Sequence, residues 1–124
     1  MSTNTSENVA FGIETLGRLK PPLCFGREIH TVALVASAYR QRRVFLTCAR
    51  LLPEQIRFVN LPPDTTLEDE RRLFSAKGQD LIELLSGELR RIIEYPVKGY
   101  IEKTEIPAGV LDAFTVLQEY FLKK

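Results

Sequence analysis

The sequence has few of the residues that most often carry catalytic or metal-binding chemistry, with one histidine and two cysteines among 124 residues. Cys24 and Cys48 lack the Cys-x-x-Cys spacing of zinc and redox sites, and we interpret them as core or half-buried residues. His30 has no cysteine, aspartate or second histidine at ligand spacing. The sequence therefore predicts no metal site.

Long apolar runs and an excess of one charge are also missing. The longest apolar stretches, such as residues 31–38, fall far short of the roughly 18 residues that a membrane-spanning helix needs. Met1 is followed by a polar run without the charged and apolar regions of a signal peptide, so we expect a cytoplasmic location. Seventeen basic and sixteen acidic side chains give a net charge of +1, which argues against nucleic acid as a partner.

The residues that are present predict an α/β chain. A helix is expected from Asn4, where an Asn cap and Glu7 at the third helical position can bond free backbone N–H groups reciprocally. Residues 31–36 form a continuous apolar run typical of a strand buried on both faces. Residues 39–52 have helical spacing, and residues 56–60 are predicted as a second strand. This strand-helix-strand order indicates a crossover in a parallel sheet.

The second half of the chain is predicted to be helical. Residues 67–94 have the pattern of one long, charged amphipathic helix that is weakened or bent around Ser86-Gly87. A last helix opens at Ile106-Pro107, with proline at its first position. Two strands are too few for a doubly wound sheet. The missing strands would come from residues upstream of Met1, from a partner chain or from an unusual compact arrangement.

Candidate binding residues follow the first predicted strand. Ligands of parallel sheets bind beyond the carboxyl ends of the strands, where Ser37 lies, and its hydroxyl can cap the next helix or bond an anion. Arg40, Arg42 and Arg43 follow, although cations near a helix N-terminus are disfavoured by roughly 0.3 to 1 kcal/mol each. They either reach carboxylates or converge with Ser37 on a phosphate or carboxylate ligand. We favour the ligand for Arg43 and solvent for Arg42.

Two runs of the sequence resemble the YdcF/SanA-like family of bacterial α/β proteins: Ser2-Thr3-Asn4-Thr5-x-Glu7-Asn8 and Ser37-x-Tyr39-x-x-x-Arg43. The ending is also similar, so the likeness covers nearly the whole chain. The resemblance implies a Rossmann-like three-layer fold whose polar motifs surround a nucleotide-like or other anionic small ligand. Binding of S-adenosylmethionine or a nucleotide, and a role in envelope maintenance, are suggested for the family. The similar segments of the ending are Gly87-Glu88-Leu89-Arg90-Arg91, Tyr95-Pro96, Lys98-Gly99-Tyr100-Ile101 and Ile106-Pro107.

The resemblance implies a set of site residues in this chain. Asn4 and Glu7 have a second interpretation, because they can form a capping box, and Glu7 can also pair with an arginine of the next helix. The family often has a histidine where this chain has Arg40. A proton-transfer role of that histidine does not carry over to Arg40, because arginine does not titrate near neutrality. The residues that the resemblance assigns to the pocket are Thr3, Asn4, Thr5, Glu7, Asn8, Ser37, Tyr39 and Arg43.

The resemblance also bears on how much of the fold this chain supplies. Members of the family begin with a strand and a glycine-bearing loop upstream of the Ser-Thr-Asn-Thr run. Residues 1–124 are therefore expected to be a single domain that forms the C-terminal portion of a larger, Rossmann-like fold. The rival hypothesis is a non-catalytic interaction or structural module that buries its open sheet edge in a homodimer.

Overall fold

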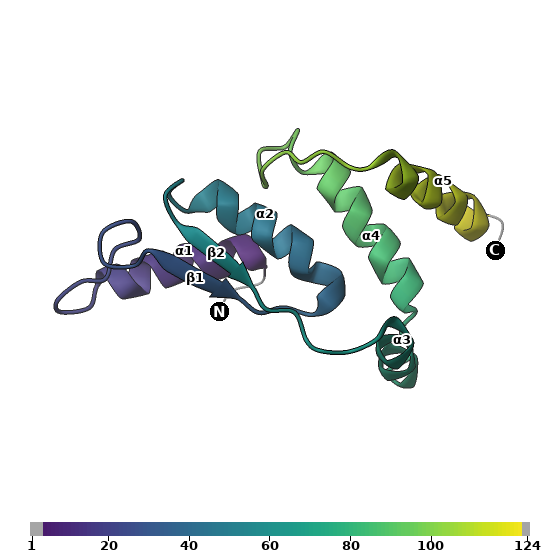
Figure 1. Cartoon of the computed structure of the whole chain (residues 1–124), viewed down its shortest axis with the longest axis horizontal. Helices are drawn as coiled ribbons and strands as arrows, with labels where there is room; N and C mark the ends of the chain where they lie inside the picture. The colour runs from purple at the N-terminus through teal and green to yellow at the C-terminus, as the bar shows by residue number, and fades with distance from the viewer. Residues whose placement is uncertain (1–3, 123–124) are drawn as a thin grey trace.

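The computed structural model describes residues 4–122 of the chain. Within this range the structure is helix-rich with a small parallel sheet, so the predicted α/β class is confirmed (Figure 1). None of the helices in residues 4–122 combines the length and apolar character needed to span a bilayer. The elements are α1 (Thr5–Gly17), β1 (Thr31–Leu34), the 3-10 turn η1 (Ala38–Arg40), α2 (Gln41–Leu51), β2 (Arg57–Asn60), α3 (Leu67–Ala76), α4 (Leu81–Glu94) and α5 (Ala108–Leu122).

The sheet of the described residues consists of β1 and β2, which pair in parallel and are joined through α2. The register places Thr31 opposite Arg57 and Leu34 opposite Asn60. α2 contacts both strands, and α1 packs against α2. The predicted crossover is confirmed, and both strands are slightly shorter than the apolar patterns indicate.

The first strand is not buried on both faces, contrary to prediction. Leu34 is 6% exposed, but Ala33 is exposed and Val35, just after the strand, is 74% exposed. Because α2 is the element that contacts the strands within residues 4–122, side chains that point away from α2 meet solvent. The apolar run therefore has one buried face in this structure.

The core lies between α2 and the sheet. It is centred on Leu34, Cys48, Leu52 and Ile56, and Val9 of α1 packs against it. Both cysteines are free thiols, Cys48 buried and Cys24 half-buried, which confirms their interpretation. Burial raises the pKa of the Cys48 thiol, so the group stays neutral and unreactive near pH 7.

Residues 67–94 form two helices rather than the single helix that their pattern predicts. Gly78 between them has φ 75°, a left-handed conformation that glycine adopts without strain. Asp80 then caps α4, because its carboxylate accepts a hydrogen bond from the Ile82 amide at 2.9 Å. The expected weak point at Ser86-Gly87 lies inside α4 and does not interrupt it.

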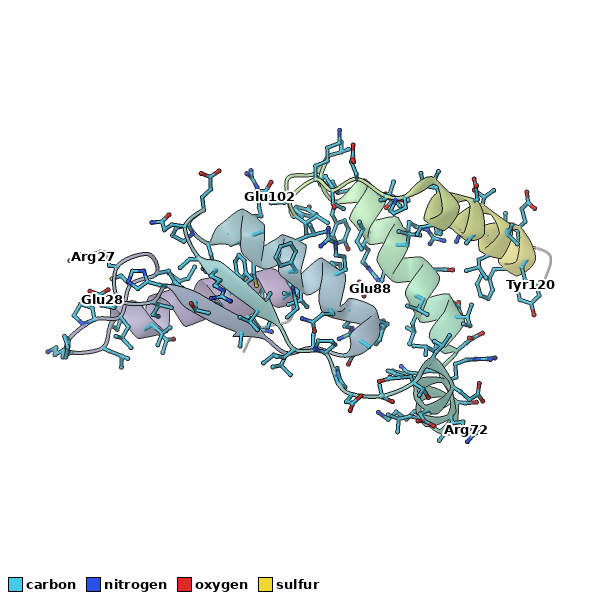
Figure 2. All side chains as sticks on the ribbon, viewed as in Figure 1. Arg27, Glu28, Arg72, Glu88, Glu102 and Tyr120 are labelled. Carbon is cyan, nitrogen blue, oxygen red and sulfur yellow. The ribbon has the colours of Figure 1, made fainter. Side chains whose placement is uncertain are left out.

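α4 links η1 and α2, which lie next to the sheet, to the helices α3 and α5. It contacts η1 and α2 on one side, whereas α3 and α5 contact α4 (Figure 1). The last helix begins at Ala108, so Pro107 directly precedes it instead of occupying its first position as predicted. Glu88 lies between α2 and α4, whereas Arg72 and Tyr120 project outward from α3 and α5 (Figure 2). The interface between α2 and α4 therefore encloses a charged side chain.

Candidate anion-binding site

Asn4 caps the first helix as the sequence predicts. The backbone amide of Glu7 donates a hydrogen bond to Asn4 Oδ1 at 2.9 Å. This bond satisfies one of the amides at the start of α1, and the remaining amides of the first turn still give the helix end a partial positive charge. Thr3 lies outside the described residues.

A cavity of about 350 Å³ opens beside this first turn. It forms where the start of α1 meets α2 and the segment that follows α4, so its walls come from three distant parts of the sequence. Four of the eight residues implied by the resemblance line it, namely Asn4, Thr5, Glu7 and Arg43. The sequence interpretation missed the other wall residues, which are Ser6, Thr47, Tyr95, Tyr100 and Ile101.

Asn8, Ser37 and Tyr39 do not line this cavity. Ser37 immediately precedes η1, but its hydroxyl makes no capping hydrogen bond, so the capping interpretation of Ser37 is wrong. Tyr39 packs edge-on against Phe74, with ring centroids 5.4 Å apart. The structure thus separates Tyr39 from the residues around the start of α1.

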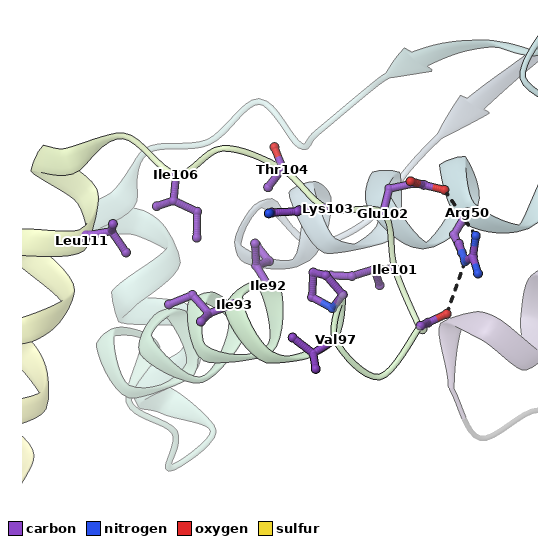
Figure 3. Close-up of a pocket in the computed structure, with 12 residues that line it drawn as sticks. Arg50, Ile92, Ile93, Val97, Ile101, Glu102, Lys103, Thr104, Ile106 and Leu111 are labelled. Carbon is purple, nitrogen blue, oxygen red and sulfur yellow. Dashed lines mark hydrogen bonds and ion pairs between the residues drawn. The ribbon is translucent and has the colours of Figure 1, made fainter.

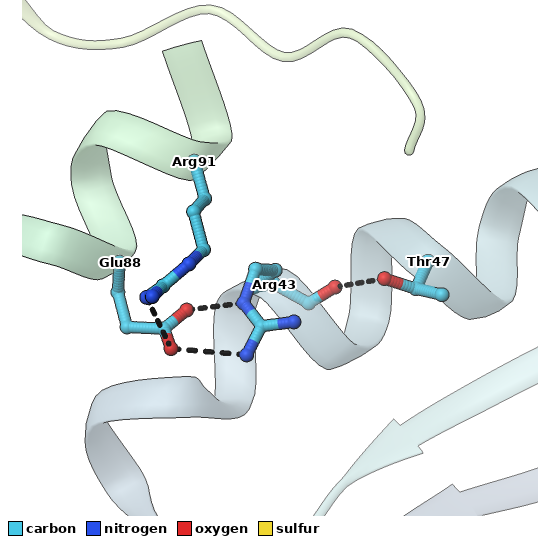
Figure 4. Close-up of polar contacts among 4 residues, drawn as sticks. All are labelled: Arg43, Thr47, Glu88 and Arg91. Carbon is cyan, nitrogen blue, oxygen red and sulfur yellow. Dashed lines mark hydrogen bonds and ion pairs between the residues drawn. The ribbon is translucent and has the colours of Figure 1, made fainter. Parts of the chain in front are cut away.

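Arg43 is held by a carboxylate from another helix. Its Nε and Nη2 donate to the two carboxylate oxygens of Glu88, the second at 3.0 Å (Figure 4). Arg91 Nη1 approaches Glu88 Oε1 at 3.4 Å. The side chains of Glu88 and Arg43 are 5% and 16% exposed. The hydrogen bonds to Glu88 raise the pKa of Arg43, so its charge is retained at any physiological pH.

The pairing leaves part of the guanidinium group available. An arginine has five N–H donors, and a bidentate carboxylate occupies two of them. The other terminal nitrogen of Arg43 points away from Glu88 (Figure 4). Glu88 lies between Arg43 and Arg91, so these three side chains carry a net charge of +1. Glu88 thus fixes the position of Arg43 while the cluster remains cationic.

The carboxyl ends of the two strands are tied together by Gln41, which the sequence interpretation missed. Its Nε2 donates to the Leu34 carbonyl and to Asn60 Oδ1, both at 2.9 Å. Its Oε1 accepts from the Ala36 amide at 3.2 Å. Gln41 is 9% exposed, and its bonds position the segment that leads from β1 into α2.

We expect Gln41→Met, which keeps the side-chain length, to lower the free energy of unfolding by about 1–3 kcal/mol, because buried backbone groups lose their partner. Urea denaturation measures the change. Gln79→Met is the matched control, since Gln79 is exposed and should shift stability by less than about 0.5 kcal/mol. Equal effects of the two substitutions would show that the Gln41 hydrogen bonds are unimportant.

A second hollow, of about 690 Å³, lies on the other side of Ile101, between the end of α4 and the segment before α5 (Figure 3). Its charged groups already interact, because Arg50 Nη1 lies 3.9 Å from Glu102 and Arg50 Nε donates to the Gly99 carbonyl. None of the described residues that the resemblance assigns to the binding pocket lines it. In the described part of the chain, no group of three His, Cys, Asp or Glu side chains is placed to hold a metal ion.

Comparisons with known proteins give one informative similarity. No protein-family model matches the chain, and no solved structure matches it. The chain is similar to the uncharacterized protein SCO4629 of Streptomyces coelicolor, with 29% identity over 115 residues. The aligned region covers 93% of this chain and 48% of the relative. The chain therefore spans about half the length of the curated relative that it matches, and the relative's name states no activity.

Proposed function

We propose that this chain belongs to the YdcF/SanA-like family and supplies the C-terminal portion of a Rossmann-like pocket for a nucleotide-like or other anionic small molecule. The observation that carries the proposal is the cavity in which Asn4 and Thr5, at the start of α1, meet Arg43 of α2. The parallel sheet agrees with such a fold. A relative about twice as long leaves room for the further strands that this fold requires.

Two sources of positive potential meet in this cavity. The start of a helix presents N–H groups and partial positive charge to an anion. Arg43 adds a full charge, and its planar group can donate two parallel hydrogen bonds to a phosphate or carboxylate. Because Glu88 already holds Arg43, little side-chain freedom is lost on binding, which favours affinity.

The wall that contains Tyr95 and Tyr100 suits a flat group. Tyr95 and Tyr100 both line the cavity, and their rings pack edge-to-face with centroids 5.4 Å apart. An aromatic surface next to cationic donors is suited to a ring that carries a phosphate or carboxylate. The volume of about 350 Å³ is at the small end of ligand pockets, roughly 300–1,000 Å³. This chain would therefore hold part of a nucleotide-sized ligand.

The test is calorimetric titration with ATP, S-adenosylmethionine and inorganic phosphate. The informative variant is the double substitution Arg43→Gln with Glu88→Gln, which removes the cation without leaving a buried carboxylate unpaired. We expect about a tenfold or greater loss of ATP affinity, the equivalent of one charge-assisted hydrogen bond. Arg72→Gln is the control, because Arg72 is 75% exposed on α3. Unchanged affinity in the double variant would exclude this cavity as the anion site.

A second candidate function is a non-catalytic interaction module that forms a homodimer. It is favoured by the sheet, because within residues 4–122 the outer edges of β1 and β2 pair with no further strand and an open edge can pair with another chain. A native mass spectrum separates the two candidates. A dimer without added mass favours the module, whereas a few hundred daltons of co-purifying ligand favours the pocket.

A further inference from the structure

The hollow of about 690 Å³ beside Ile101 has a largely apolar floor. Several of its side chains are far more exposed than core residues, because Ile93 and Leu111 are each 39% exposed and Val97 is 91% exposed. A ligand that covers this surface removes it from water, which is favourable. The apolar side chains around the hollow include Ile92, Ile93, Val97, Ile101, Ile106 and Leu111.

The charged groups that line the hollow do not balance. Arg50 and Lys103 are basic, whereas Glu102 is the one acidic residue among those that line it. Glu102 lies 3.9 Å from Arg50 Nη1, so these two charges offset each other. Lys103 has no hydrogen-bond or ion-pair partner among the described residues. Its side chain extends from the segment before α5 toward Ile92 (Figure 3), so a single cation stands over the apolar floor.

This combination matches an anion that carries an alkyl chain. A neutral apolar molecule would use the floor alone, and a polyphosphate would place several charges against isoleucine and valine side chains, which is unfavourable. A fatty acid has one carboxylate to pair with the cation and methylene groups to cover the floor. The volume of about 690 Å³ lies within the range of ligand pockets, roughly 300–1,000 Å³.

We propose that this hollow binds a medium-chain fatty acid, whose carboxylate pairs with Lys103 Nζ and whose alkyl chain covers Ile93 and Leu111. Lys103 is exposed, so the head group stays at the rim and neither charge has to lose all its water. The chain covers apolar surface of both α4 and α5. The site is separate from the proposed anion cavity, because Ile101 is the one residue that lines both.

Octanoate and 1-octanol are matched probes, because their chains have the same length and their head groups differ in charge. Each is titrated into the whole chain below the concentration at which it forms micelles, and methyl NMR follows binding. We expect both to shift the resonances of Ile93 and Leu111 but not those of Val35, which is exposed on the sheet. Hexanoate should bind about fivefold more weakly than octanoate, because two methylene groups lose part of their burial.

Two substitutions test the role of the Lys103 charge. Lys103→Met keeps most of the side chain without its charge, and Lys103→Glu reverses the charge. The ratio of octanoate affinity to octanol affinity should fall about threefold in the first and about tenfold in the second, as an exposed ion pair is lost and then replaced by repulsion. Lys20→Met is the matched control, since Lys20 is an exposed lysine in the loop after α1, and should leave the ratio unchanged.

The proposal is overturned if the Ile93 and Leu111 resonances do not shift, if Val35 shifts equally, or if the affinity ratio is the same whatever the charge of residue 103. The double variant Arg43→Gln with Glu88→Gln separates the two sites. Octanoate binding that survives in this variant supports a distinct fatty-acid site. Its loss would mean that octanoate occupies the anion cavity, which also overturns the proposal.

Discussion

Arg43→Ala is expected to lower the free energy of unfolding by about 3–5 kcal/mol, the usual cost of removing one partner from a buried ion pair. The carboxylate of Glu88 is 5% exposed and takes both its short contacts from Arg43. Arg91 remains, but at 3.4 Å from one oxygen and 44% exposed it replaces little of the lost interaction. Denaturation in urea at neutral pH measures the loss.

The neutral pair Arg43→Gln with Glu88→Gln should recover most of that stability, because burying an ion pair already costs desolvation free energy and its joint removal is often close to neutral. Arg72→Ala on exposed α3 serves as control, with a change below about 0.5 kcal/mol. Should Arg43→Ala be as stable as the wild type, Arg91 would be the partner that compensates Glu88. The large expected loss also explains why a single substitution at Arg43 cannot test ligand binding cleanly.

Local patterns in the sequence predicted much of the fold. The cap at Asn4 and the strand-helix-strand order each depend on neighbouring residues, and both are confirmed, whereas α5 starts one residue later than predicted. The single helix over residues 67–94 was wrong for a local reason as well. The amphipathic pattern continues across Gly78 and Asp80, although these two residues stop one helix and start the next.

The candidate site is harder to predict from the sequence than the fold, because its contacts join segments that are far apart in the chain. Arg43 and Glu88 are 45 positions apart, and Glu88 looks like any charged residue of an amphipathic helix. The sequence leaves open whether Arg43 binds a carboxylate of the protein or a ligand. Tertiary packing decides which faces of α2 and α4 meet, and the sequence does not show this. Tyr95 and Tyr100 reach the cavity only because the chain turns back after α4.

The second large effect on stability is expected in the apolar run that contains β1. We expect Leu34→Ala to lower the free energy of unfolding by about 2–5 kcal/mol, because Leu34 is 6% exposed and belongs to the core under α2. Val35→Ala, one residue further on, should cost less than about 0.5 kcal/mol, because Val35 is 74% exposed. Both are measured by urea denaturation at a low and a high protein concentration, so that stabilisation by association appears as a concentration dependence.

Comparing Leu34→Ala with Val35→Ala tests whether the exposed face of this apolar run is buried by another chain or segment. A sequence of this kind is typical of a strand buried on both faces, so its open face in residues 4–122 is the place where further strands, helices or a second copy would pack. If Val35→Ala costs several kcal/mol in the chain alone, its side chain must be buried by association, and the cost should then grow with protein concentration. If Val35→Ala instead has a small cost in free energy of unfolding that does not depend on protein concentration, this face is not a homodimer interface. That result would favour completion of the sheet by a longer polypeptide.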